Sequence, residues 1–254
     1  MALKDTPMRD LIFPIGVFTK DSNGDFDMVS FLGTGFVFGT EGYALTAAHV
    51  IAYELEEEHL LMGMFVNAIT NHWEGQAIDV CDIHPKEDVA LLRLSNYRLT
   101  ERALEISLDK HFAAFDYKLL GYPQANLCEN PEIRDELGRV LGRPDLIYSS
   151  GHIRRRISFS VPGVKGNSLY ELSQPVGAGC SGSPIFWMKG NTPIVIGIYV
   201  ADKTESLVFK GFNVKLDWVV QSIEFQGALS YAVRLDSLVD WIPNKLETLL
   251  DKAP

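Results

Sequence analysis

The sequence has few cysteines and no long hydrophobic run. Its three cysteines, Cys81, Cys128 and Cys180, are odd in number and far apart, with no CxxC or Cys/His spacing that suggests a metal site. The first residues hold no basic stretch followed by an apolar segment, and about 18 apolar residues never occur in succession. We therefore expect a cytoplasmic protein with reduced thiols, no membrane contact, and no metal or other cofactor.

Positive charge is also scarce, since 23 Lys and Arg residues stand against 33 Asp and Glu residues and the formal net charge is −10. A phosphate backbone would repel such a chain, so we expect no nucleic-acid partner. The exception is the run Arg154-Arg155-Arg156. Successive side chains of a strand point to opposite faces, so this run favours a solvated strand surface over a phosphate site.

Short apolar runs separated by turn residues dominate the first half of the chain. Twenty-one glycines and twelve prolines are spread among these runs, which is typical of an all-β protein. The expected strands are residues 11–19, 33–40, 43–46, 59–66, 73–82 and 89–94. Six strands in so short a stretch predict a closed barrel, which leaves no strand edge exposed.

The second half repeats this pattern. The expected strands are residues 117–121, 146–150, 152–160, 168–172, 185–188, 194–200 and 229–235. The polar stretch 99–111 separates the halves, so we place one unit at residues 1–110 and another at 111–254. Apolar residues after Asp236-Ser237 recur at helical spacing. The predicted fold is all-β, with two six-stranded antiparallel β-barrels and a C-terminal α-helix.

Three residues supply the parts that acyl transfer needs. A serine hydroxyl is a weak nucleophile, so an imidazole must take its proton while a buried carboxylate orients that imidazole. His49 follows the strand at 43–46, Asp88 precedes the strand at 89–94, and Ser181 lies in a glycine-rich bend. Such a bend can point the backbone N–H groups of Gly179 and Ser181 at one oxyanion. We therefore predict a His49–Asp88–Ser181 triad with this oxyanion hole.

Four motifs in order resemble the trypsin-like (chymotrypsin-fold) peptidases. Three carry the His, Asp, Ser chain order of that family: Thr46-Ala47-Ala48-His49, Asp88-Val89-Ala90-Leu91-Leu92 and Gly179-Cys180-Ser181-Gly182-Ser183-Pro184. The fourth, Gly33-Thr34-Gly35-Phe36, is similar to a strand of HtrA-type proteases and glutamyl endopeptidases. The resemblance implies a chymotrypsin-like serine endopeptidase working through an acyl-enzyme. We expect no PDZ domain after it, and limited proteolysis of specific intracellular partners.

The resemblance also suggests where the substrate lies. Gly197-Ile198-Tyr199-Val200 is similar to the strand that pairs with the substrate backbone, so we expect Tyr199 and Val200 to contact a protein or peptide substrate. Pro175 stands where trypsin-like specificity would place an acid, which predicts an uncharged, small to medium P1 residue. Asp202 and the segment 203–227 form either the rim of this pocket or an ordinary surface loop.

Several alternatives remain open at this stage. Cys180 adjoins Ser181, but the nucleophile stands third in Gly-Xaa-Nuc-Gly, which favours Ser181. Cys180 also replaces the aspartate that binds a new amino terminus in zymogens, so we expect no amino-terminal processing and control through loop ordering or an activating partner protein. The rival interpretation is a catalytically inactive homologue that acts as a peptide-binding module.

Overall fold

The computed structural model describes residues 8–22, 24, 26–39, 41–66, 73–95, 103–123, 127–134, 140–212 and 218–242. In these ranges strands predominate, together with short 3-10 segments at Met8–Asp10, Ala48–Ile51 and Leu235–Ser237. The expected all-β class is confirmed.

The first half of the chain forms a closed six-stranded antiparallel barrel, as predicted. Its strands are β1 (Ile12–Lys20), β2 (Phe26–Val37), β3 (Tyr43–Thr46), β4 (Leu60–Val66), β5 (Trp73–Ile83) and β6 (Ala90–Leu94), in the order β1-β2-β3-β6-β5-β4. Gly42 adopts φ 76° in the turn before β3, a conformation that glycine tolerates without strain. Each of these six strands pairs with two neighbours, which closes the barrel.

The second half forms a seven-stranded sheet, so the prediction of six strands there needs correction by one additional strand. Its strands are β7 (Glu105–Ile106), β8 (Asp116–Gly121), β11 (Ile147–Ile157), β12 (Leu169–Leu172), β13 (Pro184–Lys189), β14 (Thr192–Phe212) and β15 (Trp218–Arg234). The order is β13-β8-β11-β12-β15-β14-β7, and β13 also pairs with β14, which joins six strands in a ring. The seventh strand, β7, pairs in parallel with β14. This strand was not predicted, because its two residues are too few to show the alternation of apolar and polar residues that marks a strand.

Other expectations need revision or fall outside the described residues. The stretch between β8 and β11, where no strand is predicted, contains a hairpin of β9 (Leu127–Arg134) and β10 (Val140–Pro144). The C-terminal helix is not shown, because the described chain ends at residue 242 just after the 3-10 turn Leu235–Ser237. The division of the chain at residue 110 stays a prediction.

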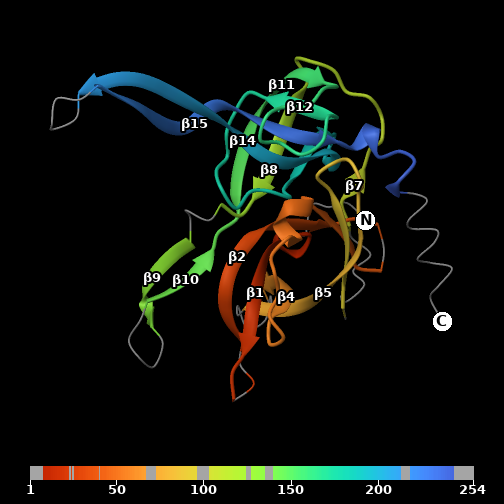
Figure 1. Cartoon of the computed structure of the whole chain (residues 1–254). Coiled ribbons are helices and arrows are strands. Elements are labelled where there is room, and N and C mark those ends of the chain that lie inside the picture. Colours follow the sequence, from red (N-terminus) through yellow and green to blue (C-terminus); the bar gives the residue numbers. More distant parts are fainter. Residues whose placement is uncertain are drawn as a thin grey trace.

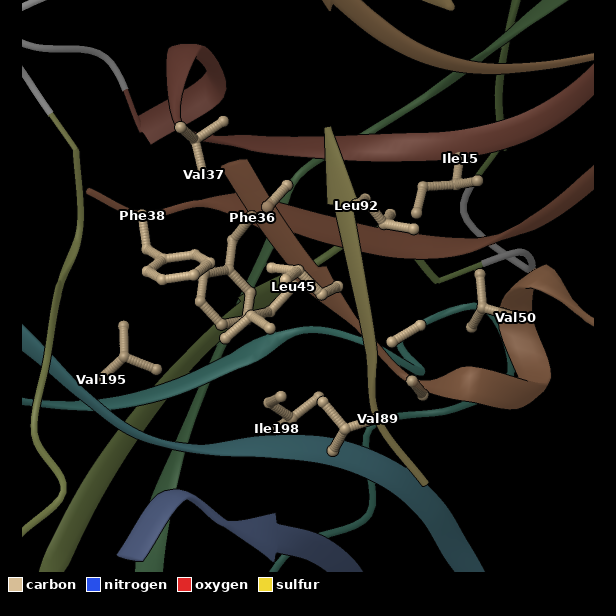
Figure 2. Close-up of a cluster of buried hydrophobic side chains, with 14 of the residues drawn as sticks. Ile15, Phe36, Val37, Phe38, Leu45, Val50, Val89, Leu92, Val195 and Ile198 are labelled. Carbon is tan, nitrogen blue, oxygen red and sulfur yellow. The ribbon is translucent and has the colours of Figure 1, made fainter. Parts of the chain in front are cut away.

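One hydrophobic core connects the two halves (Figure 2). Phe36, Phe38 and Leu45 of the barrel lie in the same buried cluster as Val195 and Ile198 of β14. Each large apolar side chain buried in this way contributes roughly 1.5–3 kcal/mol relative to an exposed one. Shared burial therefore holds the two sheets against each other, and the loops between them are positioned by both.

The hairpin of β14 and β15 extends well beyond the sheet (Figure 1). Its pairing runs from Thr204 with Gln226 to Phe212 with Trp218, after a register irregularity between Asp202 and Thr204. Bulges of this kind bend a strand and increase its twist. We call the segment from Thr204 to Gln226 the arm.

The arginine run on β11 does not simply alternate between faces. A register shift between Ile153 and Arg155 leaves both Arg154 and Arg155 exposed beside Glu171. Arg156 is mostly covered and forms an ion pair with Asp236. All three cations have carboxylate partners, so the run belongs to the sheet surface and does not form a phosphate site.

Candidate active site

The pairing of β3 with β6 brings His49 next to Asp88. Thr46, the last residue of β3, lies opposite Ala90, the first residue of β6. His49 follows β3 by three residues in a 3-10 turn, and Asp88 precedes β6 by two. The two segments therefore meet at the same end of the barrel.

Asp88 holds His49 by two hydrogen bonds. The His49 Nδ1 atom lies 2.6 Å from one carboxylate oxygen, and the His49 backbone N–H donates to the other at 3.0 Å. The Asp88 side chain is 5% exposed, whereas the His49 side chain is 47% exposed. The ring is thus oriented from the buried side through Nδ1, while about half of the side chain stays open to solvent.

Ser181 lies in a tight bend built by glycines. Gly179 and Gly182 both have φ 90°, where side-chain-bearing residues are strained. A Cβ atom on Gly182 would also collide with the backbone oxygen of Thr34. Gly182 N–H donates to the Tyr199 carbonyl at 2.7 Å, which ties the bend to β14.

Thr34 of β2 connects this bend to the first barrel. Its N–H donates to the Ser181 carbonyl at 2.8 Å, and its hydroxyl donates to the Gly179 carbonyl at 3.1 Å. The Thr46 hydroxyl in turn donates to the Thr34 carbonyl at 2.7 Å. The sequence marked the Gly33-Thr34-Gly35-Phe36 motif, but not this function, because the partners of Thr34 are distant in the chain.

The polar groups of Gly179 and Ser181 form few hydrogen bonds within the protein. The Ser181 hydroxyl donates to the Val200 carbonyl at 3.2 Å, and no hydrogen bond joins it to His49. Within the described ranges, the N–H groups of Gly179 and Ser181 donate to no protein acceptor. Two unpaired amides on either side of Cys180 match what an oxyanion hole requires.

Cys180 is buried and unsuited to be a nucleophile. Burial, with a smaller contribution from the charge of Asp202, raises the pKa of its thiol to about 12. A thiol with that pKa is protonated at neutral pH, and the thiolate is the reactive form. The side chain instead packs in a core cluster with Ile185 and Tyr199.

Of the residues predicted to bind substrate, Tyr199 and Val200 bond to Gly182 and Ser181, and Asp202 follows on the same strand. The Asp202 carboxylate accepts hydrogen bonds from the N–H groups of Val176 and Gly177, at 3.0 and 2.9 Å, and from the Tyr199 hydroxyl. Pro175 directly precedes this pair of amides. Burial and the neighbouring Asp202 charge raise the pKa of Tyr199, so its hydroxyl stays neutral and donates.

Glu87 is a further residue of the site that the sequence gave no reason to single out. Its side chain is 4% exposed and accepts hydrogen bonds from the N–H groups of Asn167 and Ser168, both at 3.2 Å. His84 Nδ1 accepts the Glu87 N–H at 2.8 Å. The residue before Asp88 thus anchors its loop to the second sheet.

The described residues contain no group of three or more His, Cys, Asp or Glu side chains that could hold a metal ion. None of the described helices has the length and apolar character to span a membrane.

Solved structures of proteases share this fold. One is the apo protease domain of MamO from Magnetospirillum magneticum, with 13% identity, a TM-score of 0.55, and coverage of 92% of this chain and 96% of that one. Another is the HtrA-type protease AlgW with a decapeptide, at 14% identity and a TM-score of 0.60, where the match covers 94% of this chain but 65% of AlgW. Deg5 matches at 14% identity, a TM-score of 0.57, and 95% and 90% coverage.

No curated protein matches this sequence. A family model described as the trypsin-like peptidase domain matches residues 33–198. That range begins at the glycine motif of β2, includes His49, Asp88 and Ser181, and ends in β14. The chain therefore belongs to the trypsin-like peptidase domain family.

Proposed function

We propose that the protein is a serine endopeptidase that uses His49, Asp88 and Ser181 to hydrolyse peptide bonds through an acyl-enzyme. The observation that carries this proposal is the buried Asp88 carboxylate bound to His49 Nδ1 at 2.6 Å. Such a pair fixes the imidazole tautomer that leaves Nε2 free to accept a proton, and it stabilises the imidazolium formed afterwards.

The first half-reaction forms the acyl-enzyme. Ser181 Oγ attacks the peptide carbonyl carbon while His49 Nε2 takes the hydroxyl proton, and the carbonyl oxygen becomes an oxyanion. The N–H groups of Gly179 and Ser181 stabilise that oxyanion. The C–N bond then breaks, His49 gives its proton to the leaving amine, and an ester to Ser181 remains.

The second half-reaction hydrolyses this ester. His49 takes a proton from water, whose oxygen attacks the acyl carbon and forms a second oxyanion in the same hole. The C–O bond to Ser181 breaks, the Ser181 oxygen recovers a proton from His49, and the new carboxylic acid leaves. Asp88 stays ionised throughout and orients the ring.

A fluorophosphonate probe tests this proposal, because phosphonylation requires an activated serine. We expect labelling of the wild-type protein and none of Ser181→Ala, while Cys180→Ala still labels. Labelled protein digested and sequenced should carry the modification on Ser181. Wild-type protein that stays unlabelled at high probe concentration, while folded by circular dichroism, would contradict the proposal.

One observation favours the rival function, a peptide-binding module without catalysis. The Ser181 hydroxyl donates to the Val200 carbonyl and not to His49. A rotation about the Ser181 side-chain torsion is needed before proton transfer, and catalytic hydrogen bonds often tighten only when substrate binds. A binding module would bind peptides tightly yet remain unlabelled by the probe.

For the substrate, we propose an uncharged P1 residue of small to medium size. The Asp202 carboxylate already accepts three hydrogen bonds, from Val176, Gly177 and Tyr199, which supports a structural role over pairing with a basic P1 side chain. Profiling with a peptide library measures this preference. Strong selection for Lys or Arg would contradict it.

We further propose that the protein acts in the cytoplasm on one or a few protein partners and needs no amino-terminal cleavage. The buried Cys180 offers no carboxylate to a new α-amino group. Protein beginning at Met1 should therefore label with the probe by itself, and an activating partner should change only the rate of labelling. Labelling that arises only after removal of the first residues would contradict this.

A further inference from the structure

The edge of β14 beside Ser181 is free over a long stretch. The Tyr199 N–H and carbonyl pair with Ser183 and Gly182, and the Val200 carbonyl accepts the Ser181 hydroxyl. From that point to Phe212, β15 pairs with one edge of β14. Among the described strands, none pairs with the other edge.

Free strand edges are usually shortened or protected in native proteins, since they attract other strands. Here the edge continues into the arm, and the arm also exposes apolar side chains. Val208 is 61% exposed, and Lys210 projects on the same face two residues later. A long unpaired edge beside the exposed Val208 and Lys210 side chains suits the addition of an extended peptide strand.

The direction of an added peptide strand follows from the direction of β14 and the preference for antiparallel pairing. β14 runs from Val200, beside Ser181, outward to Phe212. Antiparallel pairing is slightly more stable per residue than parallel pairing, so a peptide strand on this edge should run from the arm toward Ser181. The peptide residues on the arm are then those that precede the scissile bond.

We propose that the arm is a substrate-binding extension, on which ten or so residues amino-terminal to the cleaved bond add as an antiparallel strand to the free edge of β14. The inference rests on the proposed function and defines the substrate class: an extended, β-forming segment that lies upstream of the cleavage site. The occupant is the substrate chain itself, because this edge is continuous with the strand beside the nucleophile.

A nested peptide series tests this. Starting from the best short peptide of the P1 library, Thr-Val repeats are added at the amino-terminal side in steps of three residues, and in a control series at the carboxy-terminal side. We expect kcat/KM to rise at least about tenfold with amino-terminal length, since each added backbone hydrogen bond contributes modestly but several form. The carboxy-terminal series should stay flat, and proline at alternate positions should abolish the gain.

Two variants locate the effect on the arm. Replacing residues 205–225 by a two-residue Asn-Gly turn should reduce the ratio of kcat/KM between long and short peptides to about one. If this deletion does not fold, Val208→Lys tests the same contact, because cross-strand neighbours interact by charge. The Val208→Lys variant should favour Thr-Glu over Thr-Lys extensions by several-fold relative to wild type.

The matched control is Val80→Lys on β5, since Val80 is also an exposed strand valine, at 45%, but lies in the first barrel. It should leave the preference between the two extensions unchanged. Equal kcat/KM at all peptide lengths, or an arm deletion that changes only the oligomeric state, would overturn the inference. Absence of probe labelling would instead contradict the proposed function itself, so the two failures are distinguishable.

Discussion

At the residue scale, Cys180 and Ser181 are adjacent but differ in what surrounds them. The Cys180 side chain is fully buried, whereas the Ser181 hydroxyl lies at the surface of the bend and bonds to Val200. Burial keeps the thiol protonated, and a neutral buried thiol behaves as a small apolar side chain. The chemistry of position 180 is therefore limited to its backbone.

We predict that Ser181→Ala and His49→Ala each lower kcat by about 10⁴–10⁶-fold relative to wild type, because each removes part of one proton-transfer unit. Asp88→Asn should lower kcat by about 10⁴-fold relative to wild type. Cys180→Ala should retain most turnover. Steady-state cleavage of the best library peptide measures this, and iodoacetamide should inactivate the native protein slowly. A Cys180→Ala variant without turnover beside an active Ser181→Ala would identify a cysteine peptidase.

Gly182 should not tolerate a side chain, and a comparison with Gly163 separates the effect of backbone strain from that of a collision. Both Gly182 and Gly163 have positive φ, but only at Gly182 would a Cβ collide with Thr34. Gly163→Ala should cost about 1–2 kcal/mol of unfolding free energy from backbone strain alone. Gly182→Ala should cost more and abolish probe labelling. Urea unfolding measures both, and equal costs would show that the collision is relieved.

At the element scale, the loop before β6 is held by the second sheet through Glu87. We predict that Glu87→Ala lowers the free energy of unfolding by about 1–3 kcal/mol, since the partly buried N–H groups of Asn167 and Ser168 lose their carboxylate acceptor. Probe labelling should also slow, because Asp88 is the next residue. Urea unfolding and labelling rates measure the two effects.

The control for this prediction is Glu57→Ala, which removes an exposed glutamate of the first half and should change neither measurement. Glu87→Gln, which keeps one acceptor oxygen, should recover part of both losses. If Glu87→Ala unfolds at the wild-type urea concentration, the contact between the loop and the second sheet does not contribute to stability.

At the scale of the whole molecule, the described core contains several fully buried tyrosines. Tyr117, Tyr122, Tyr170 and Tyr199 are among the largest fully buried side chains. Desolvation raises the pKa of Tyr117 to about 12 and raises the pKa of the other three as well. All four stay neutral in the folded protein at pH values where an unfolded chain would ionise them.

We therefore predict alkaline destabilisation. Unfolded tyrosines ionise at about pH 10, whereas the folded ones ionise only at higher pH. The stabilisation that comes from keeping them neutral is therefore fully present below about pH 10 and is lost as the pH rises through the folded pKa. The free energy of unfolding should fall by up to about 1.4 kcal/mol per pH unit for each such tyrosine. Urea midpoints measured from pH 8 to 11 test it; Tyr117→Phe should flatten the slope, and a constant midpoint would contradict it.

Much of this fold could be predicted because its signals are local. The strand β3 was predicted with its correct ends, since its apolar run is bounded by turn residues. The short β7, the hairpin of β9 and β10, and the arm were not, because their pairing depends on partners elsewhere in the chain. The predicted strands end at residue 200 and begin at residue 229, because the apolar pattern reports only the buried part of a strand. The hydrogen-bonded pairing of β14 with β15 continues beyond that part as far as Phe212 and Trp218.

The sequence by itself determined the all-β class, the family and the chain order of His49, Asp88 and Ser181, because these depend on residue types at short, fixed spacings. Only the tertiary structure decided that Thr34 holds the carbonyls of Gly179 and Ser181, contacts that join residues 145 positions or more apart. Local spacing constrains what a segment can form, but the partner that satisfies a buried donor is selected by packing of the whole chain.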